Sequence, residues 1–115
     1  MLTKPYRLSR QSDFGKLKKN GRSFFSPSLR FRYLANYLPQ SRFSVVVSTK
    51  ISKKAVVRNR LRRQLLEIIR LNLAKIKPGY DFLIFTSQKA LDLDYGQMEQ
   101  EVLFSLKRSS LLNKA

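Results

Sequence analysis

Hydrophobic residues recur along this chain at two spacings, one typical of helices and the other of strands. The clearest helical spacing lies between residues 53 and 75. At about 100° per residue, one quadrant of such a helix holds Val57, Leu61, Leu65 and Ile68. Its opposite side holds Asn59, Arg60, Arg63, Glu67 and Arg70. The pattern predicts a helix with one face for a core and one strongly cationic face.

Strand spacing predicts a sheet made of four segments. Residues 29–37 alternate at first, and one face of this strand receives Leu29, Phe31, Tyr33 and Ala35. The other face receives Arg30 and Arg32. Residues 42–48 form a β-branched run and residues 80–86 an apolar run, which predict two buried strands. A short strand is expected at residues 23–26.

The first residues predict an arm followed by a short helix. Residues 1–11 are polar and basic, and Pro5 disfavours a helix, so an extended basic arm is expected there. Ser12 is a favoured N-cap, and Asp13 suits the positive end of a helix dipole. The helix is expected to end at Asn20-Gly21, since glycine suits the position after a helix.

The last predicted helix completes the order of elements. Asp92 or Asp94 is expected to cap a helix that reaches about Leu112. Its core-facing residues are expected to be Met98, Val102, Leu103, Leu106 and Leu111. The order is then α-β-β-β-α-β-α. The strand–helix–strand unit around residues 53–77 predicts parallel pairing within an α/β, or α+β, sandwich.

The charge of the chain indicates a binding protein. Its 115 residues predict one domain over residues 1–115. The net charge is +17, and its distribution is uneven: residues 1–66 hold 17 Lys and Arg against Asp13 alone, whereas residues 67–115 hold 7 against 6. A charge this large and this concentrated predicts an anionic partner.

The residues for catalysis are missing from the sequence. The chain has no His and no Cys, which excludes the commonest general base, disulfides and thiolate metal sites. Its seven carboxylates are scattered, and the pairs Asp92, Asp94 and Glu99, Glu101 are interpreted as capping and solvation. No catalytic or metal-binding residue is therefore predicted. No segment suits a membrane span or a secretion signal, so a cytoplasmic protein is expected.

The basic helix is interpreted as a polyanion site, against the alternative of a solvated helix face. Ser52 is expected to cap its N-terminus, where backbone N–H groups beside Lys50, Lys53 and Lys54 suit a phosphate. Arg58 and Arg62 lie at the border of the apolar stripe, where their stems can pack and their heads reach outward.

RNA is the expected polyanion, and DNA is not. A helix-turn-helix needs a second short helix before the recognition helix, but the β-branched run at residues 45–47 precedes this one. A sheet with aromatic and arginine residues beside a basic helix suits single-stranded RNA and phosphates. Two alternatives stay open: Phe14 can be core, and Arg30 and Arg32 can protect an edge strand from aggregation.

The segment AVVRNRLRR, residues 55–63, carries a resemblance to a known family. The chain resembles the protein component of bacterial ribonuclease P, whose hallmark is an Arg-Asn-Arg helix led by a Ser-Lys-Lys-like turn. The resemblance extends to RLSRQSDFGKLKKNGRS near the start, RFSVVVSTK, DFLIFTSQKA and LKRSSLL near the end. It therefore covers nearly the whole chain.

The resemblance implies a ribosomal-protein-like fold with an unusual left-handed βαβ crossover. It also implies a function: the protein is the non-catalytic subunit of an endoribonuclease that matures the 5′ end of precursor tRNA. A large RNA subunit with its Mg²⁺ ions performs the hydrolysis, and the protein itself binds no cofactor. Its partners are that RNA and the precursor tRNA. The rival interpretation is a structural ribosomal or RNA-chaperone protein, which would co-purify with ribosomal subunits or mixed RNA.

The resemblance also implies residue roles. The RNA subunit is expected to bind Lys50, Lys53, Lys54, Arg58, Asn59, Arg60, Arg62 and Arg63. The 5′ leader of the substrate is expected in a cleft between the sheet and the central helix, formed by Phe14, Lys18, Arg30 and Arg32. Lys18 and Arg32 stand where the family often has aromatic residues, and Leu66 stands where a basic residue is common. This cleft is expected to rely on charge more than on stacking.

Overall fold

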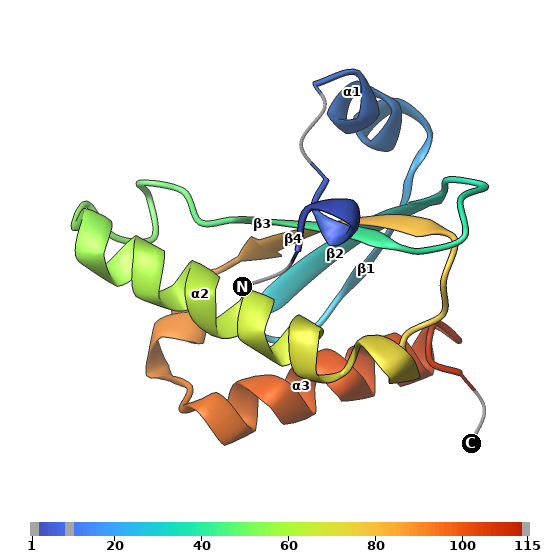
Figure 1. Ribbon diagram of the computed structural model, residues 1–115. Helices are drawn as coiled ribbons and strands as arrows, with labels where there is room; N and C mark the ends of the chain where they lie inside the picture. Colours follow the sequence, from blue (N-terminus) through green and yellow to red (C-terminus); the bar gives the residue numbers. More distant parts are fainter. Residues whose placement is uncertain (1–2, 9–10, 114–115) are drawn as a thin grey trace.

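The computed structural model describes residues 3–8 and 11–113, and it is built on one four-stranded sheet (Figure 1). The strands are β1 (Arg22–Phe25), β2 (Leu29–Ala35), β3 (Arg42–Val46) and β4 (Tyr80–Thr86). Their order across the sheet is β1-β2-β4-β3. β2 is antiparallel to β1 and to β4, whereas β3 and β4 are parallel. The predicted parallel pairing is therefore confirmed.

Within the described residues, three helices complete the order α-β-β-β-α-β-α, as predicted. They are α1 (Gln11–Asn20), α2 (Ala55–Leu71) and α3 (Tyr95–Arg108). Short 3-10 turns lie at Lys4–Tyr6, Leu73–Lys75 and Gln88–Asp92. Figure 1 shows α2 and α3 on one side of the sheet and α1 on the other. Among the described residues, no helix is long and apolar enough to cross a membrane.

The main core lies between the sheet and the helices α2 and α3. The α2 residues Leu61, Leu65 and Ile68 are buried there, and Val57 is half-buried. Phe43 and Phe82, from neighbouring strands, stack with their ring centroids 5.2 Å apart. The predicted alternation of β2 is confirmed, since its apolar face supplies Leu29 and Phe31 to this core.

A smaller cluster lies on the other face of the sheet, under α1. Leu8, Leu17 and Leu83 form its buried centre, and Phe14, Leu34 and Phe85 pack against them. These are few apolar side chains for an attached helix, so α1 needs further contacts to hold its position.

The N-terminal arm lies against the sheet. Its described residues include the 3-10 turn at Lys4–Tyr6, where an extended arm was expected. The Leu8 N–H donates to the Phe43 carbonyl at 2.9 Å, and the Leu8 side chain is buried. Residues 1, 2, 9 and 10 of the predicted arm lie outside the described part of the chain.

Two predicted N-caps are wrong. α1 begins at Gln11, so Ser12 lies inside it. α2 begins at Ala55 with Lys54 as its N-cap residue, and the Ser52 hydroxyl accepts a hydrogen bond from the Lys54 N–H at 3.2 Å. Ser52 thus forms a turn before the helix.

Asp94, one of the two residues predicted to cap α3, is its N-cap. The Asp94 Oδ1 accepts from the Gln97 N–H at 2.8 Å, and Gln97 Oε1 accepts from the Asp94 N–H at 3.0 Å. Both long helices end earlier than expected, at Leu71 and Arg108.

Candidate nucleic-acid interface

The outward face of α2 presents the predicted cations. Asn59, Arg60 and Arg63 are exposed, while Arg58 and Arg62 are half-buried at the border of the core. Because Leu61 and Leu65 face the core, Asn59, Arg60 and Arg63 on the opposite side of the helix must point outward. The amphipathic pattern therefore fixes where these arginines lie.

Local hydrogen bonds orient the arginines around Asn59. Arg62 Nη1 donates to the Asn59 side-chain oxygen at 2.8 Å, and Arg63 Nε donates to the Asn59 carbonyl at 3.4 Å. Arg58 Nη1 donates to the Ser52 carbonyl at 2.9 Å and so ties the helix to the preceding turn. A guanidinium has five N–H donors, so one such bond leaves others for a phosphate. Asn59 thus positions its neighbours.

The N-terminus of α2 lies beside three exposed lysines. Lys54 is the N-cap residue, and its side chain makes no capping hydrogen bond. Lys50 and Lys53 lie in the turn just before it, and all three lysines are exposed. The first N–H groups of a helix attract anions through their partial positive charge. The structure therefore brings together the predicted elements of a phosphate site.

Glu67, the acidic residue of α2, is paired with Arg70 near the C-terminal end of the helix. Arg70 Nε donates to Glu67 Oε2 at 3.0 Å, which lowers the pKa of Glu67 and raises the pKa of Arg70. Tyr95 of α3 lies nearby, and its burial raises the pKa of its hydroxyl. The arginines of the first turns, Arg58 to Arg63, are left as a block of positive charge.

The second predicted group, the leader cleft, lies on the sheet face that α1 covers. Arg30 and Arg32 point to this face, and the core that α2 packs against lies on the opposite one. The expectation that the central helix walls this cleft is therefore wrong. Side chains alternate along β2, so a helix that packs on Phe31 cannot also flank Arg30. The wall beside these arginines is α1.

Arg30 lies over an aromatic ring at the open part of this face. Its guanidinium carbon is 4.2 Å from the ring centroid of Phe85. The two residues help to line a hollow of about 350 Å³ that also includes Phe25, Val46 and Ser48. An exposed arginine beside an aromatic ring offers a phosphate contact and a stacking surface together.

Arg32 has a different role from the predicted cationic floor. Its Nε donates to the Leu17 carbonyl at 2.5 Å, its Nη2 to the Lys18 carbonyl at 2.6 Å, and its Nη1 to the Ser23 hydroxyl at 2.8 Å. The first two acceptors are carbonyls of the last turn of α1, where a cation is favoured. Arg32 therefore fastens the end of α1 to the sheet.

Phe14 and Lys18 belong to α1 itself. Phe14 is half-buried against the small cluster around Leu17 and Leu83. Lys18 is exposed one turn later. Phe14 therefore combines a packing contact with partial exposure, and neither it nor Lys18 lines the hollow at Arg30 and Phe85.

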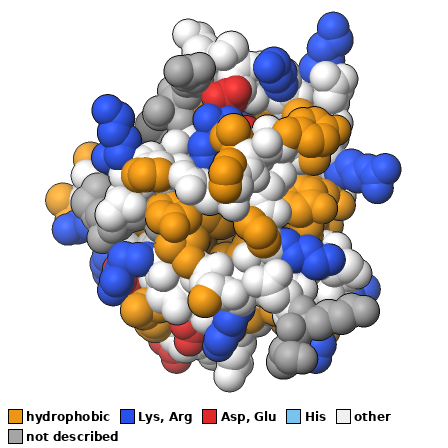
Figure 2. Space-filling view, turned by 45° about the vertical axis from the view of Figure 1, so that its right-hand side comes forward, with side chains coloured by type: hydrophobic (Ala, Val, Ile, Leu, Met, Phe, Trp, Pro, Cys, Tyr) orange, Lys and Arg blue, Asp and Glu red, His pale blue; other side chains and the backbone are white. Residues whose placement is uncertain are grey.

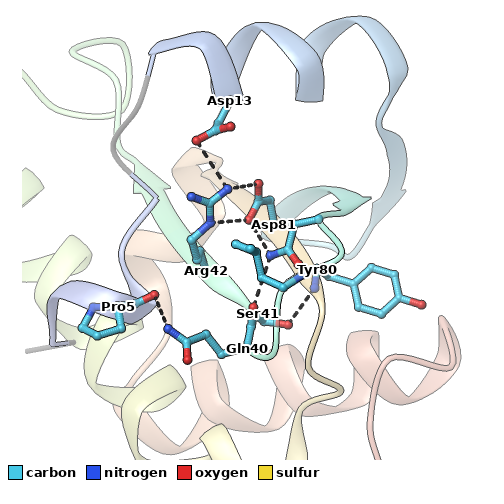
Figure 3. Close-up of polar contacts among 9 residues, drawn as sticks. Pro5, Asp13, Gln40, Ser41, Arg42, Tyr80 and Asp81 are labelled. Carbon is cyan, nitrogen blue, oxygen red and sulfur yellow. Dashed lines mark hydrogen bonds and ion pairs between the residues drawn. The ribbon is translucent and has the colours of Figure 1, made fainter.

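Arg42 is the residue that the sequence analysis missed (Figure 3). Its Nε and Nη2 donate to the two carboxylate oxygens of Asp81 at 2.8 and 2.7 Å. Its Nη2 also lies 3.3 Å from Asp13 Oδ2, on α1. The hydrogen bond to Asp81 raises the pKa of Arg42. An arginine and an aspartate at the starts of two predicted buried strands were the signal that could have indicated this pair.

This contact changes the interpretation of the carboxylates. Asp13 and Asp81 converge on Arg42, and Asn36 Nδ2 donates to Asp81 Oδ1 at 2.9 Å. Across the described ranges, no three His, Cys, Asp or Glu residues gather closely enough to bind a metal ion together. Figure 2 shows Lys and Arg side chains spread over one face around a central area of hydrophobic side chains, with fewer Asp and Glu side chains among them. Such a surface can bind a polyanion.

A family model and the sequences of known relatives agree on what this chain is similar to. A family model described as Ribonuclease P matches residues 2–110. The ribonuclease P protein component of Cyanothece sp. is 33% identical, with 98% of each chain covered. That of Pelotomaculum thermopropionicum is 36% identical, covering 90% of this chain and 92% of the relative.

Solved structures show the same likeness. The RNase P protein of Thermotoga maritima superposes with a TM-score of 0.82 at 30% identity, over 89% of this chain and 96% of that one. A mutant RNase P protein of Staphylococcus aureus, described as defective in mRNA degradation, gives a TM-score of 0.86 at 25% identity, over 94% and 91%.

Proposed function

This chain belongs to the ribonuclease P protein family, and we propose that it is the protein subunit of a ribonuclease P that matures the 5′ end of precursor tRNA in the cytoplasm. The observation that carries the proposal is the block of arginines on α2 beside a lysine-flanked helix start. The RNA subunit, with its Mg²⁺ ions, would supply the chemistry. The protein would supply binding and electrostatic screening.

The RNA subunit would bind the first half of α2 and the turn before it. Arg60 and Arg63 project outward there, and Asn59 holds Arg62 in place for the same surface. Lys50, Lys53 and Lys54 would contact phosphates together with the helix N-terminus. Arg58 would act from the border of this surface, since one of its donors already holds the turn at Ser52.

The 5′ leader of the precursor would lie in the cleft between α1 and the exposed part of the sheet face. Phe14 would stack on a base, while Lys18 and Arg30 would contact phosphates. Arg32 would contribute by holding α1 in place, because its guanidinium donates to α1 carbonyls and to Ser23. This assignment keeps the predicted residues but gives Arg32 a positioning role.

Cleavage of precursor tRNA tests the whole proposal. The assay compares protein alone, RNA subunit alone and the mixture across a Mg²⁺ series. We expect no cleavage by the protein alone, cleavage by the RNA alone at high Mg²⁺, and cleavage by the mixture at low Mg²⁺. The reason is that the protein screens the repulsion between two polyanions. Site-specific cleavage by RNA-free protein would contradict the proposal, as would a protein without effect on the Mg²⁺ requirement.

Replacing Phe14 tests the leader cleft. A base stacked on an aromatic side chain contributes about 1–3 kcal/mol, so Phe14→Ala is expected to weaken precursor binding by roughly ten-fold or more. Binding of mature tRNA, which has no leader, is expected to change little. Both affinities are measured for the holoenzyme at fixed Mg²⁺. Equal losses on the two RNAs would show that Phe14 acts through packing with Leu17 and Leu83.

A further inference from the structure

Two exposed phenylalanines lie close together where the proposed leader cleft ends: Phe25 lines the hollow at Arg30, and Phe104 lies outside it. Phe25, at the end of β1, is 72% exposed, and Phe104, on α3, is 62% exposed. They line one hollow of about 240 Å³, together with Pro27, Ser105 and Arg108. Large aromatic side chains at this exposure leave apolar surface in water, which indicates a binding site.

This hollow shares lining residues with the larger hollow on the sheet face. Phe25, Ser26 and Pro27 line both the hollow at Phe104 and the larger one at Arg30 and Phe85. Phe25 pairs with Arg30 on the face of Phe85, whereas Phe104 belongs to α3 on the other side of the sheet, so a ligand strand that lies over Phe85 would reach Phe104 by passing around the edge of the sheet at β1.

Each end of this path combines an arginine with a phenylalanine ring. The guanidinium carbon of Arg108 is 5.8 Å from the ring centroid of Phe104, and that of Arg30 is 4.2 Å from the ring centroid of Phe85. Arg30 and Arg108 are both exposed. Proteins that bind single-stranded nucleic acid use this combination, in which bases stack on rings and cations follow the phosphates.

Glu101 also lines the hollow at Phe104, and its carboxylate already has a structural role. Glu101 Oε2 accepts hydrogen bonds from the Ser26 hydroxyl at 2.6 Å and from the Ser28 N–H at 3.1 Å. These bonds fasten the turn between β1 and β2 to α3, and so fix Phe25 relative to Phe104. The Glu101 carboxylate thus fixes the shape of the hollow, while Arg30 and Arg108 supply positive charge toward the solvent.

We propose that Phe25, Phe104 and Arg108 form a second stacking site for unpaired nucleotides of the 5′ leader, beyond those held at Phe14 and Arg30. The inference rests on the proposed function. The leader is the fitting occupant because it is single-stranded and anionic, and because its proposed cleft opens directly onto Phe25. A base would stack on the ring of Phe104 or Phe25, and Arg108 would contact the adjoining phosphate.

The test compares the wild-type holoenzyme with the double variant Phe25→Ala/Phe104→Ala and with Arg108→Gln. Precursor tRNA and mature tRNA are titrated with each holoenzyme, and the RNA subunit is titrated with each free protein. The double variant is expected to bind the precursor about ten-fold or more weakly, Arg108→Gln several-fold more weakly, and both to bind mature tRNA and the RNA subunit as the wild type does. Leu71→Ala, at a 56% exposed leucine of α2, is the matched control and is expected to change nothing.

A second measurement locates the contact. A fluorescent base analogue is placed at each leader position in turn, and stacking quenches it. Phe104→Ala is expected to restore fluorescence at positions different from those that Phe14→Ala affects. Unchanged precursor affinity, or equal losses on mature tRNA or the RNA subunit, would overturn this site and leave the proposed function intact. A wild-type holoenzyme that does not prefer precursor over mature tRNA would overturn both.

Discussion

Arg42→Met is expected to lower the free energy of unfolding by about 3 kcal/mol. The substitution leaves the carboxylate of Asp81 without its bidentate partner, and the side chain of Asp81 is 9% exposed. Removing one partner of a buried ion pair is strongly destabilising because the other charge stays buried without a counter-charge. Such losses are about 3–5 kcal/mol. The lower value is expected here because a fifth of the Arg42 side chain is exposed. Urea denaturation followed by circular dichroism measures the change.

The control for this prediction is Arg70→Met. Its partner Glu67 lies on the surface of α2, where both charges remain solvated, so little change in stability is expected. The double variant Arg42→Met/Asp81→Leu is expected to regain much of the lost stability, because it removes the uncompensated charge. A loss in Arg42→Met no larger than in Arg70→Met would show that the Asp13–Arg42–Asp81 contact contributes nothing to stability.

Replacing Arg58, Arg60, Arg62 and Arg63 together by Gln is expected to reduce affinity for the RNA subunit by orders of magnitude at physiological salt. Each lost phosphate contact lowers the slope of log K against log salt by about one unit, so the slope is expected to fall by about four. Titrations at several salt concentrations measure both quantities. Single Ala substitutions are expected to lower the slope by roughly one unit each.

The matched variant removes four charges elsewhere, at Arg22, Lys75, Lys89 and Lys107, all of which are exposed. If α2 makes the phosphate contacts, this variant keeps most of the slope of log K against log salt, although its net charge equals that of the α2 variant. Similar losses in the two variants would mean that the RNA responds to total charge and that α2 has no special role.

The sequence was sufficient to predict which face of α2 and of β2 is buried, although it did not predict the N-caps of α1 and α2 or the ends of α2 and α3 correctly. The spacing of Leu61, Leu65 and Ile68 placed the α2 cations on the outer face, and the alternation around Phe31 placed Arg30 on the opposite face from the core. Both patterns are local, because the period of an element fixes which side chains are buried together.

The contacts between elements could not be predicted in the same way. The sequence does not say which sheet face α1 covers, so the cleft was assigned to the wrong helix. Arg32 looked like a free cation of β2, but its position opposite the end of α1 makes it a partner of the Leu17 and Lys18 carbonyls. The Asp13–Arg42–Asp81 contact joins three elements, and although the positions of Arg42 and Asp81 at the starts of two strands could have indicated that pair, nothing in the sequence indicated Asp13. Burial has a sequence period, whereas the pairing of polar groups across elements has none.

Because Arg32 and Arg42 hold α1 in place, the wall of the cleft is already ordered before RNA binds. Arg42 contacts Asp13 near the start of α1, and Arg32 binds the carbonyls near its end, so both ends of the helix are fixed in the free protein. The conformational entropy of forming this wall is therefore lost during folding and does not oppose binding. An RNA strand that enters the cleft has to lose mainly its own flexibility, and a rigid receptor of this kind raises affinity without a single additional contact.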